Sequence, residues 1–338
     1  MTREPYTQTM NLKAKILSPA QAMIFYELIP PRAGAAQELE GLLTLCRELT
    51  GTVDAINIPE IYEESRRESV PGRKPLPERI EPRAFAKAIQ TTAGIESVVN
   101  RVTVHHPEPA QLRWMRETYT EYGIRNLILV GGESRQMGYP GPSVVEAAKL
   151  SRQEGLDFLL GGITIPSRSH EQERVRQKYA QGLSFFTTQV LLDSNDIVDL
   201  IQGLNGLDVR IFLSFAPISN RRDLEFLKWL GVDVPNNVVW AVEQGGDAAM
   251  AVEKSTSLAS AILTDVFDNL PAHPPALGIN IEQITRRNFG AARQMLAHLG
   301  PFYRRHLQTR YPGATGDCEP ASLFEAPDQA TSPKWRQP

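Results

Sequence analysis

The sequence predicts an α/β fold, a parallel (β/α)8 TIM barrel, as a single domain with a flexible C-terminal tail. Two observations indicate this fold. Short apolar runs rich in β-branched residues alternate with longer stretches whose leucines recur at helical spacing, and eight strands can be counted. At 338 residues, the chain is also long enough for one barrel without dividing further. A doubly wound open sheet remains the alternative.

The strand predictions rest on apolar runs of strand length. The first run, residues 23–29, carries one glutamate, Glu27, and stops at Pro30 and Pro31, which continue neither a helix nor a ladder. The later strands are predicted at residues 55–59, 97–105, 126–132, 158–166, 183–192, 209–217 and 276–282.

The helix predictions rest on apolar residues three and four apart, and Ser143 has the character of an N-cap. Residues 1–20 form an N-terminal extension in which residues 11–16 are expected to form a short helix that plugs one end of the fold. The barrel spans residues 21–305, and residues 306–338 form the tail. Helices are predicted at residues 35–48, 82–92, 110–122, 143–154, 169–181, 194–204, 221–230, 247–267 and 285–299.

The bulk composition excludes several classes of protein. A formal net charge of -3 gives no reason to expect nucleic acid or an anionic membrane as partner. No apolar stretch reaches the length of a membrane span, and the N-terminus lacks the apolar core of a signal peptide, so we expect a cytoplasmic protein. Two distant cysteines, Cys46 and Cys318, offer neither a disulfide framework nor a zinc knuckle.

Polar residues at the ends of the predicted strands mark the candidate site. In a parallel barrel these ends meet at one mouth, where catalytic residues gather. Glu27 is the foremost candidate, although it could instead form a structural ion pair with an arginine such as Arg32. The residues expected at the mouth are Glu27, Glu60, Arg101, His105, Glu133, Thr164, Gln189, Asn220 and Glu282.

Other residues and motifs indicate which ligands and reactions the site could support. Gln189 lies among apolar residues, and its amide offers a donor and an acceptor to the edge of a heterocyclic ring. His105 and His106 are neighbours that point to opposite faces of a strand, so we predict no metal site. Phosphate loops, dinucleotide fingerprints and nucleophile elbows are absent. Arg174 and Lys178 lie in a charged helix that could be a solvated face or hold a pyrophosphate.

Five stretches, in order, resemble the methylenetetrahydrofolate reductase family. They are FYELIPPR, GIRNLILVGGE, KYAQG, TTQVLLD and APISN, and the resemblance covers roughly residues 12–300. The family consists of flavin-dependent barrels that reduce 5,10-methylenetetrahydrofolate to 5-methyltetrahydrofolate with NADH or NADPH. The resemblance implies Glu27 as the general acid and a folate bound by Gln189, Glu133 and Glu282.

The resemblance also implies a set of FAD contacts. These fall on Arg101, Gly131, Gly132, Ile165, Arg174 and Lys178. The chain departs from the family on this side of the site, since Arg101 stands where the family has a histidine and Ile165 where a tyrosine could stack. A flavin-free reductase that takes hydride directly from a nicotinamide is therefore a variant of the same hypothesis.

Two rival functions remain open at this point. One is a methyltransferase that binds a methylated pterin without redox chemistry, and the other is a non-catalytic partner subunit that keeps the barrel. The barrel fold alone does not choose among them. As partner we expect a small-molecule folate substrate, with neither nucleic acid nor a membrane, and we leave open whether the chain forms a homo-oligomer.

Overall fold

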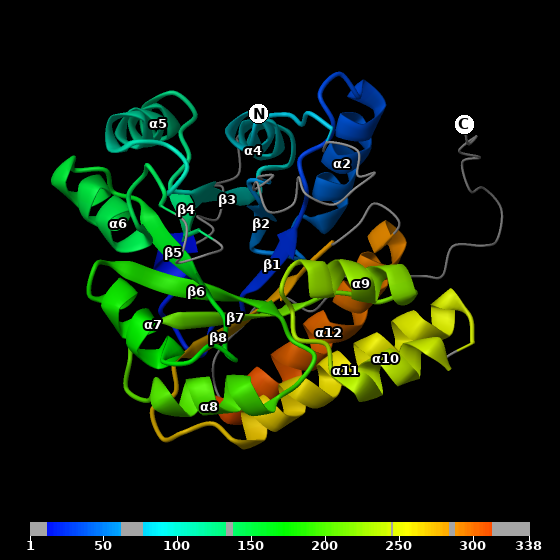
Figure 1. The fold of residues 1–338 in the computed structure, drawn as a ribbon. Helices are drawn as coiled ribbons and strands as arrows, with labels where there is room; N and C mark the ends of the chain where they lie inside the picture. Colours follow the sequence, from blue (N-terminus) through cyan, green and yellow to red (C-terminus); the bar gives the residue numbers. More distant parts are fainter. Residues whose placement is uncertain (1–11, 62–76, 133–137, 245, 284–287, 313–338) are drawn as a thin grey trace, which may run out of the picture.

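The eight strands close into one barrel, and all neighbouring strands pair in parallel, including β1 with β8 (Figure 1). The predicted (β/α)8 barrel is confirmed. The computed structural model describes residues 12–61, 77–132, 138–244, 246–283 and 288–312. The strands are β1 Ile24–Glu27, β2 Ala55–Ile58, β3 Glu96–Val102, β4 Asn126–Val130, β5 Leu159–Thr164, β6 Leu183–Val190, β7 Arg210–Phe215 and β8 Ala276–Ile281.

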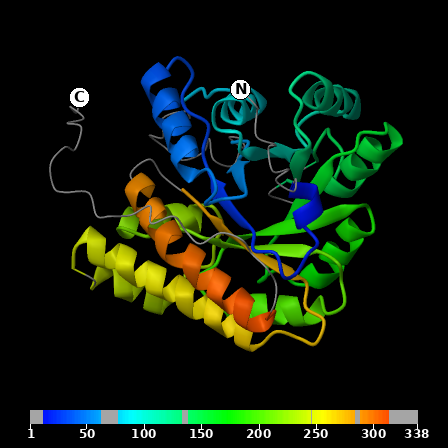
Figure 2. The same cartoon turned by 180° about the vertical axis from the view of Figure 1, so that it is seen from behind.

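The helices cover the outer face of the barrel, and α11 and α12 pack side by side along one flank (Figure 2). Ser143 caps α6 in a reciprocal capping box with Glu146, as its position predicts. The helices are α1 Leu12–Lys15, α2 Ala36–Leu49, α4 Pro82–Ala93, α5 Glu108–Thr120, α6 Val144–Gln153, α7 Glu171–Tyr179, α8 Asn195–Gly203, α9 Arg221–Trp229, α10 Asn236–Glu243, α11 Ala248–Asp268 and α12 Phe289–Arg310.

Aromatic rings fill the middle of the barrel. Phe25 stacks on Phe212 with ring centroids 3.8 Å apart, and Phe185 meets both rings edge-on. Gly161 of β5 lies beside Phe185 of β6, and Gly278 of β8 lies beside Phe212 of β7. Both glycines leave room for these rings, since an added Cβ would lie 2.4 Å from Phe185 or 2.5 Å from Phe212. The interior below the mouth is therefore a packed apolar core.

The short helix α1 closes the opposite end of the barrel. Leu12 and Ile16 are buried with the interior residues, as the predicted plug requires. Arg210, fully buried at the start of β7, fastens this segment by donating to the carbonyl oxygens of Ile16 at 2.7 Å and Ser18 at 2.5 Å, and also to those of Lys15, Gln21 and Leu277. Main-chain oxygens thus compensate this buried cation.

The sequence prediction differs from the structure most at the C-terminal helix. The prediction ended this helix at residue 299, because Gly300 and Pro301 usually end helices. Helix α12 instead runs to Arg310, beyond residue 306, where the sequence places the start of the tail. Its second half is held by packing, since Tyr303 is fully buried and donates to the Leu277 carbonyl at 2.9 Å. Residues 313–338 lie outside the described residues.

Two further findings complete the fold. Helix α10 was not predicted, because its segment NNVVWAVE is rich in β-branched residues, which favour strands. Pro235 immediately precedes α10, where a proline is well tolerated. Across the described ranges, no helix combines the length and apolar character needed to cross a bilayer.

Candidate functional site

Alternation along the strands decides which side chains face the mouth. In β1, Phe25 packs in the barrel interior, whereas Ile24 and Tyr26 pack against the surrounding helices. Glu27 therefore faces inward at the strand's C-terminal end. It aligns with Asn57 of β2, whose side-chain nitrogen lies 3.1 Å from Glu27 Oε2. Arg32 forms its ion pair with Glu38, so the alternative pairing of Glu27 with Arg32 is not observed.

Glu282 lies beside Glu27 at the mouth. The register of β1 and β8 aligns Tyr26 with Ile281, so the next residue of each chain segment projects from neighbouring positions to the same inner face. Burial is the main reason that the pKa of Glu27 is well above its usual value, and the Glu282 charge raises it further. Burial likewise raises the pKa of Glu282 to about 7, although hydrogen bonds from Ser214 and Asn280 oppose the shift.

Buried carboxamides surround the two carboxyl groups. The side-chain nitrogen of Asn280 donates to Ser214 Oγ at 3.0 Å and to Glu282 Oε1 at 3.3 Å. Because the side-chain nitrogens of Asn57 and Asn280 donate to the carboxyl groups, the side-chain oxygens of these two asparagines point away from them. These two oxygens and that of Asn100 are buried and accept no hydrogen bond from the described residues. Unpaired buried acceptors are costly, and a donor-rich ligand would satisfy them.

Gln189 lies near the end of β6, where a register shift between Thr187 and Val190 interrupts the alternation of inward and outward side chains. Its side chain is partly buried, and its amide nitrogen donates to the carbonyl of Leu230, at the end of α9, at 3.3 Å. Of the predicted mouth residues, the structure brings Glu27 and Glu282 together. Glu133 lies outside the described residues.

Arg101 points away from the barrel interior. It alternates with inward-facing Val98 and Asn100, and its guanidinium lies under α5. Its Nη1 contacts Glu60 Oε1 at 2.6 Å, its Nε donates to Gln111 Oε1 at 3.0 Å, and its guanidinium carbon lies 4.5 Å from the Trp114 ring centre. Both Arg101 and Glu60, expected at the mouth, are thus joined in the wall between β3 and α5.

The residues assigned to the cofactor near α7 gather around one buried acid, Glu171. Glu171 Oε1 accepts from the Ile165 amide at 3.1 Å and from Thr164 Oγ1 at 3.0 Å. Its Oε2 lies 3.6 Å from Arg174 Nε. The ammonium of Lys178 donates to the Ile163 carbonyl at 2.6 Å, and burial lowers its pKa.

The remaining predicted positions lie on the rim. Gly131 and Gly132 are exposed after β4. An added Cβ on Gly132 would lie 2.3 Å from the Tyr139 ring, so the space that the missing side chain leaves is occupied by Tyr139 of the same chain. His105 meets the same Tyr139 ring edge-on with centroids 5.6 Å apart. Asn220 caps α9 by accepting from the amides of Arg222 and Asp223.

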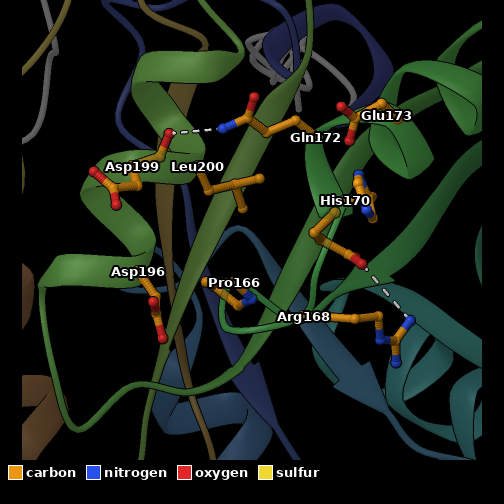
Figure 3. A pocket seen from close by; sticks show the side chains of 9 residues that line it. Pro166, Arg168, His170, Gln172, Glu173, Asp196, Asp199 and Leu200 are labelled. Carbon is orange, nitrogen blue, oxygen red and sulfur yellow. Dashed lines mark hydrogen bonds and ion pairs between the residues drawn. The ribbon is translucent and has the colours of Figure 1, made fainter.

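A separate polar pocket of about 280 Å³ lies between α7 and α8 (Figure 3). Neither Glu27 nor Glu282 lines it. Gln172 of α7 donates to the carbonyl of Asp199 of α8 at 3.1 Å across one side of this pocket. Its lining residues are Pro166, Arg168, His170, Glu171, Gln172, Glu173, Asp196, Asp199 and Leu200.

Comparison with known proteins finds similarity in structure but no match in sequence. No protein-family model matches the chain, and no curated protein matches it in sequence. A solved structure of an uncharacterised protein from Clostridium thermocellum that binds two copies of 5-methyl-5,6,7,8-tetrahydrofolic acid is similar, with a TM-score of 0.67 and 19% identity over 86% of this chain and 99% of that one. A 2,3-dimethylmalate lyase of the PEP mutase/isocitrate lyase superfamily has a TM-score of 0.44 and 14% identity over 91% of this chain and 90% of that one. The similarity to the folate-binding protein shows the barrel fold alone.

The sequence analysis missed the polar residues that hold the carboxyl groups. Asn57, Ser214 and Asn280 are buried at 0–1% exposure and stand in otherwise apolar strands. A usable signal existed, because a lone asparagine in AINI or ALGINI is costly to bury unless it has a partner. Nothing in the isolated strands, however, tells which face each asparagine occupies.

Proposed function

We propose that the chain binds a reduced folate at the mouth of its barrel and reduces 5,10-methylenetetrahydrofolate to 5-methyltetrahydrofolate. The observation that carries this proposal is the pair Glu27 and Glu282, whose raised pKa values keep a carboxylic acid available near neutral pH. The folate-binding neighbour of the same fold supports the choice of ligand.

The chemistry of the mouth also suits a pterin ring. A reduced pterin carries hydrogen-bond donors at its 2-amino group and ring nitrogens, whereas the mouth presents the unpaired amide oxygens of Asn57, Asn100 and Asn280. Gln189 can offer its amide oxygen to such a ring, since its nitrogen already donates to Leu230. Donor-rich ligand and acceptor-rich site are complementary.

In the proposed reaction, Glu27 is the general acid. Opening of the five-membered ring of the substrate requires a proton on the departing nitrogen, and a protonated Glu27 supplies it. Asn57 donates to Glu27 Oε2, which leaves Oε1 to carry that proton. A reduced nicotinamide then provides the hydride that converts the bridging carbon to a methyl group.

The residues assigned to FAD do not fit a flavin pyrophosphate. Arg101 is paired with Glu60 in the barrel wall, Arg174 with Glu171, and the Lys178 ammonium is bound to a main-chain carbonyl. None of these three cations is therefore available for a phosphate. We accordingly propose direct hydride transfer from NADH or NADPH, without a step through flavin.

The same contacts favour a second candidate function. A protein that binds a methylated pterin for methyl transfer, or without catalysis, needs no site for a redox cofactor. It would retain the acceptor-rich mouth and bind 5-methyltetrahydrofolate, the ligand of the similar barrel. It would not consume reduced nicotinamide.

The deciding experiment measures oxidation of NADH and NADPH at 340 nm with 5,10-methylenetetrahydrofolate, after the visible spectrum of the purified protein has been recorded. We expect a spectrum without flavin bands and folate-dependent oxidation that Glu27→Gln abolishes. Glu40→Gln is the matched control, since its side chain is 68% exposed on α2. Folate binding without oxidation would replace the reductase with the second candidate, and absence of folate binding would exclude both.

A further inference from the structure

Glu27 and Glu282 lie on paired strands and face the same space. Their neighbours in the chain, Tyr26 and Ile281, are partners in the β1–β8 ladder. Each carboxyl group accepts a hydrogen bond from an asparagine. Asn280, two residues earlier in the chain, donates to Glu282, and Asn57, on the neighbouring strand β2, donates to Glu27. Because separate residues orient the two groups, the pair is part of the barrel and not a chance approach of flexible side chains.

The inner face of the described strands offers this pair no cation. Toward the C-terminal ends of the other described strands, the inward residues are uncharged: Asn57, Asn100, Val130, Ile163, Thr187 and Ser214. The basic residue on the inner face is Arg210, which binds main-chain carbonyls at the other end of β7.

The titratable groups on the described rim are directed elsewhere. His105 meets the ring of Tyr139, and burial together with the nearby charges of Arg101 and His105 lowers the pKa of His106 on the same loop. Asp223, at the start of α9, accepts from the amide of Ser219 at 2.8 Å and from its hydroxyl at 2.6 Å. Two carboxylates in this setting repel each other, and one shared proton removes that repulsion.

We propose, on the basis of the proposed function, that Glu27 and Glu282 hold one proton between them and that Glu282 is a positioning residue for the acid. The charge of Glu282 keeps the proton on Glu27 until the substrate takes it. Glu282 then faces the cation that the reaction creates, and so stabilises it.

The atoms and charges of this step balance. The O–H bond of Glu27 breaks and a bond forms from the proton to N10 of the folate. The bond from N10 to the bridging carbon breaks with its electron pair on N10, and a double bond forms from N5 to that carbon, giving an iminium cation. Hydride from the reduced nicotinamide converts the iminium to the methyl group, and the carboxyl pair regains one proton from water.

A second carboxylate changes the conditions for proton donation. Burial alone would keep Glu27 protonated but would also disfavour the ionised Glu27 that donation leaves behind. With Glu282 beside it, the doubly ionised pair is unfavourable in the empty site and becomes favourable when the iminium cation lies against it. Proton donation is thereby coupled to formation of the cation.

The test is the pH profile of kcat/KM for the wild type, Glu282→Gln and Glu282→Asp. Glu282→Gln keeps the shape but removes the charge, so we expect the alkaline limb of the profile to move to lower pH. Each pH unit of movement lowers kcat/KM about tenfold on that limb. Glu282→Asp retains the charge and should keep the limb close to its wild-type position. A uniform loss at all pH values, or an aspartate variant that behaves as the glutamine variant, would overturn the proposal.

A measurement without substrate separates this inference from the proposed function. Infrared absorption of protonated carboxyl groups, recorded against pH, follows Glu27 as the band that Glu27→Gln removes. In Glu282→Gln this band should disappear at lower pH than in the wild type, with folding checked by circular dichroism. An unchanged titration refutes the pairing even if the reductase is active. If the titration moves but no reductase activity exists, the pairing stands and the catalytic role of Glu282 is refuted.

Discussion

The cost of burying Glu282 should appear as a pH-dependent loss of stability. Its pKa is about 7 in the folded protein against an ordinary value of 4.5. A carboxyl group that binds its proton more tightly when folded contributes no penalty below pH 4.5, and the penalty grows as the pH rises to about 7. At roughly 1.4 kcal/mol for each pH unit, the full penalty is at most about 3.5 kcal/mol, a large part of a stability of about 5–15 kcal/mol.

Glu282→Gln removes this titration while it retains a side chain of the same size. We expect the free energy of unfolding of the variant, relative to the wild type, to rise by about 2–3 kcal/mol between pH 5 and pH 8. Urea denaturation at intervals across this range measures the difference at each pH. The change with pH is the informative quantity, because a constant offset reports only altered packing or hydrogen bonds.

A matched control separates this effect from a general loss of a glutamate. Glu40, exposed on α2 beside Arg47, is replaced by glutamine in the same way, and its stability difference from the wild type should stay nearly constant with pH. Parallel stability curves for the wild type and Glu282→Gln would refute the raised pKa of Glu282. They would also remove the main physical support for an acid available at the mouth.

Three further substitutions test the rest of the structure. Glu27→Gln should lower the rate of folate reduction by about a thousandfold or more, since an amide is a poor proton donor, while 5-methyltetrahydrofolate still quenches the protein fluorescence; near-normal turnover would exclude Glu27 as the acid. Gln189→Ala should weaken folate binding by about 1–3 kcal/mol in calorimetry, and an unchanged Kd would remove Gln189 from the site. Arg210→Met should lower the free energy of unfolding by on the order of 3–5 kcal/mol, because main-chain carbonyls buried under α1 lose their donor; a normal urea midpoint would contradict this.

The fold could be predicted because the sequence signals agree with one another. Apolar runs such as NLILV and ALGINI have the length of strands, and the segments between them have helical spacing. The prediction failed where long-range packing overrides local preference. Helix α12 continues through Pro301 because residues of its second half, including Tyr303 and Leu307, are buried against the barrel and α11. Such contacts join residues that are distant in the chain, as Tyr303 meets Leu277 and Met23, and they leave no local signal.

The site was predictable in its position but not in its orientation. A strand end that carries a lone glutamate before two prolines indicates the mouth, and the structure places Glu27 there. Arg101 and Lys178 carry charges suited to a phosphate, yet both are turned into the barrel wall. Strands buried on both faces are apolar throughout, so composition does not tell which alternate residues face inward. Asn100 and Arg101 are consecutive residues of β3, so they face opposite sides of the strand, and Arg101 points outward while Asn100 points inward.

In a closed barrel, knowing which alternate residues of one strand face inward also fixes which residues of the paired strands face inward. Once Glu27 is taken to face the mouth, the parallel pairing of β1 with β2 and β8 places Asn57 and Asn280 on the same inner face. Asn280 and Glu282 are two residues apart and must share that face. The two carboxyl groups and the residues that orient them are thus linked by backbone geometry, whereas the expected cofactor contacts lie on separate elements, Arg101 on β3 and Arg174 and Lys178 on α7. Under the proposed function, the acid site can therefore be kept while Arg101, Arg174 and Lys178 are engaged in internal contacts.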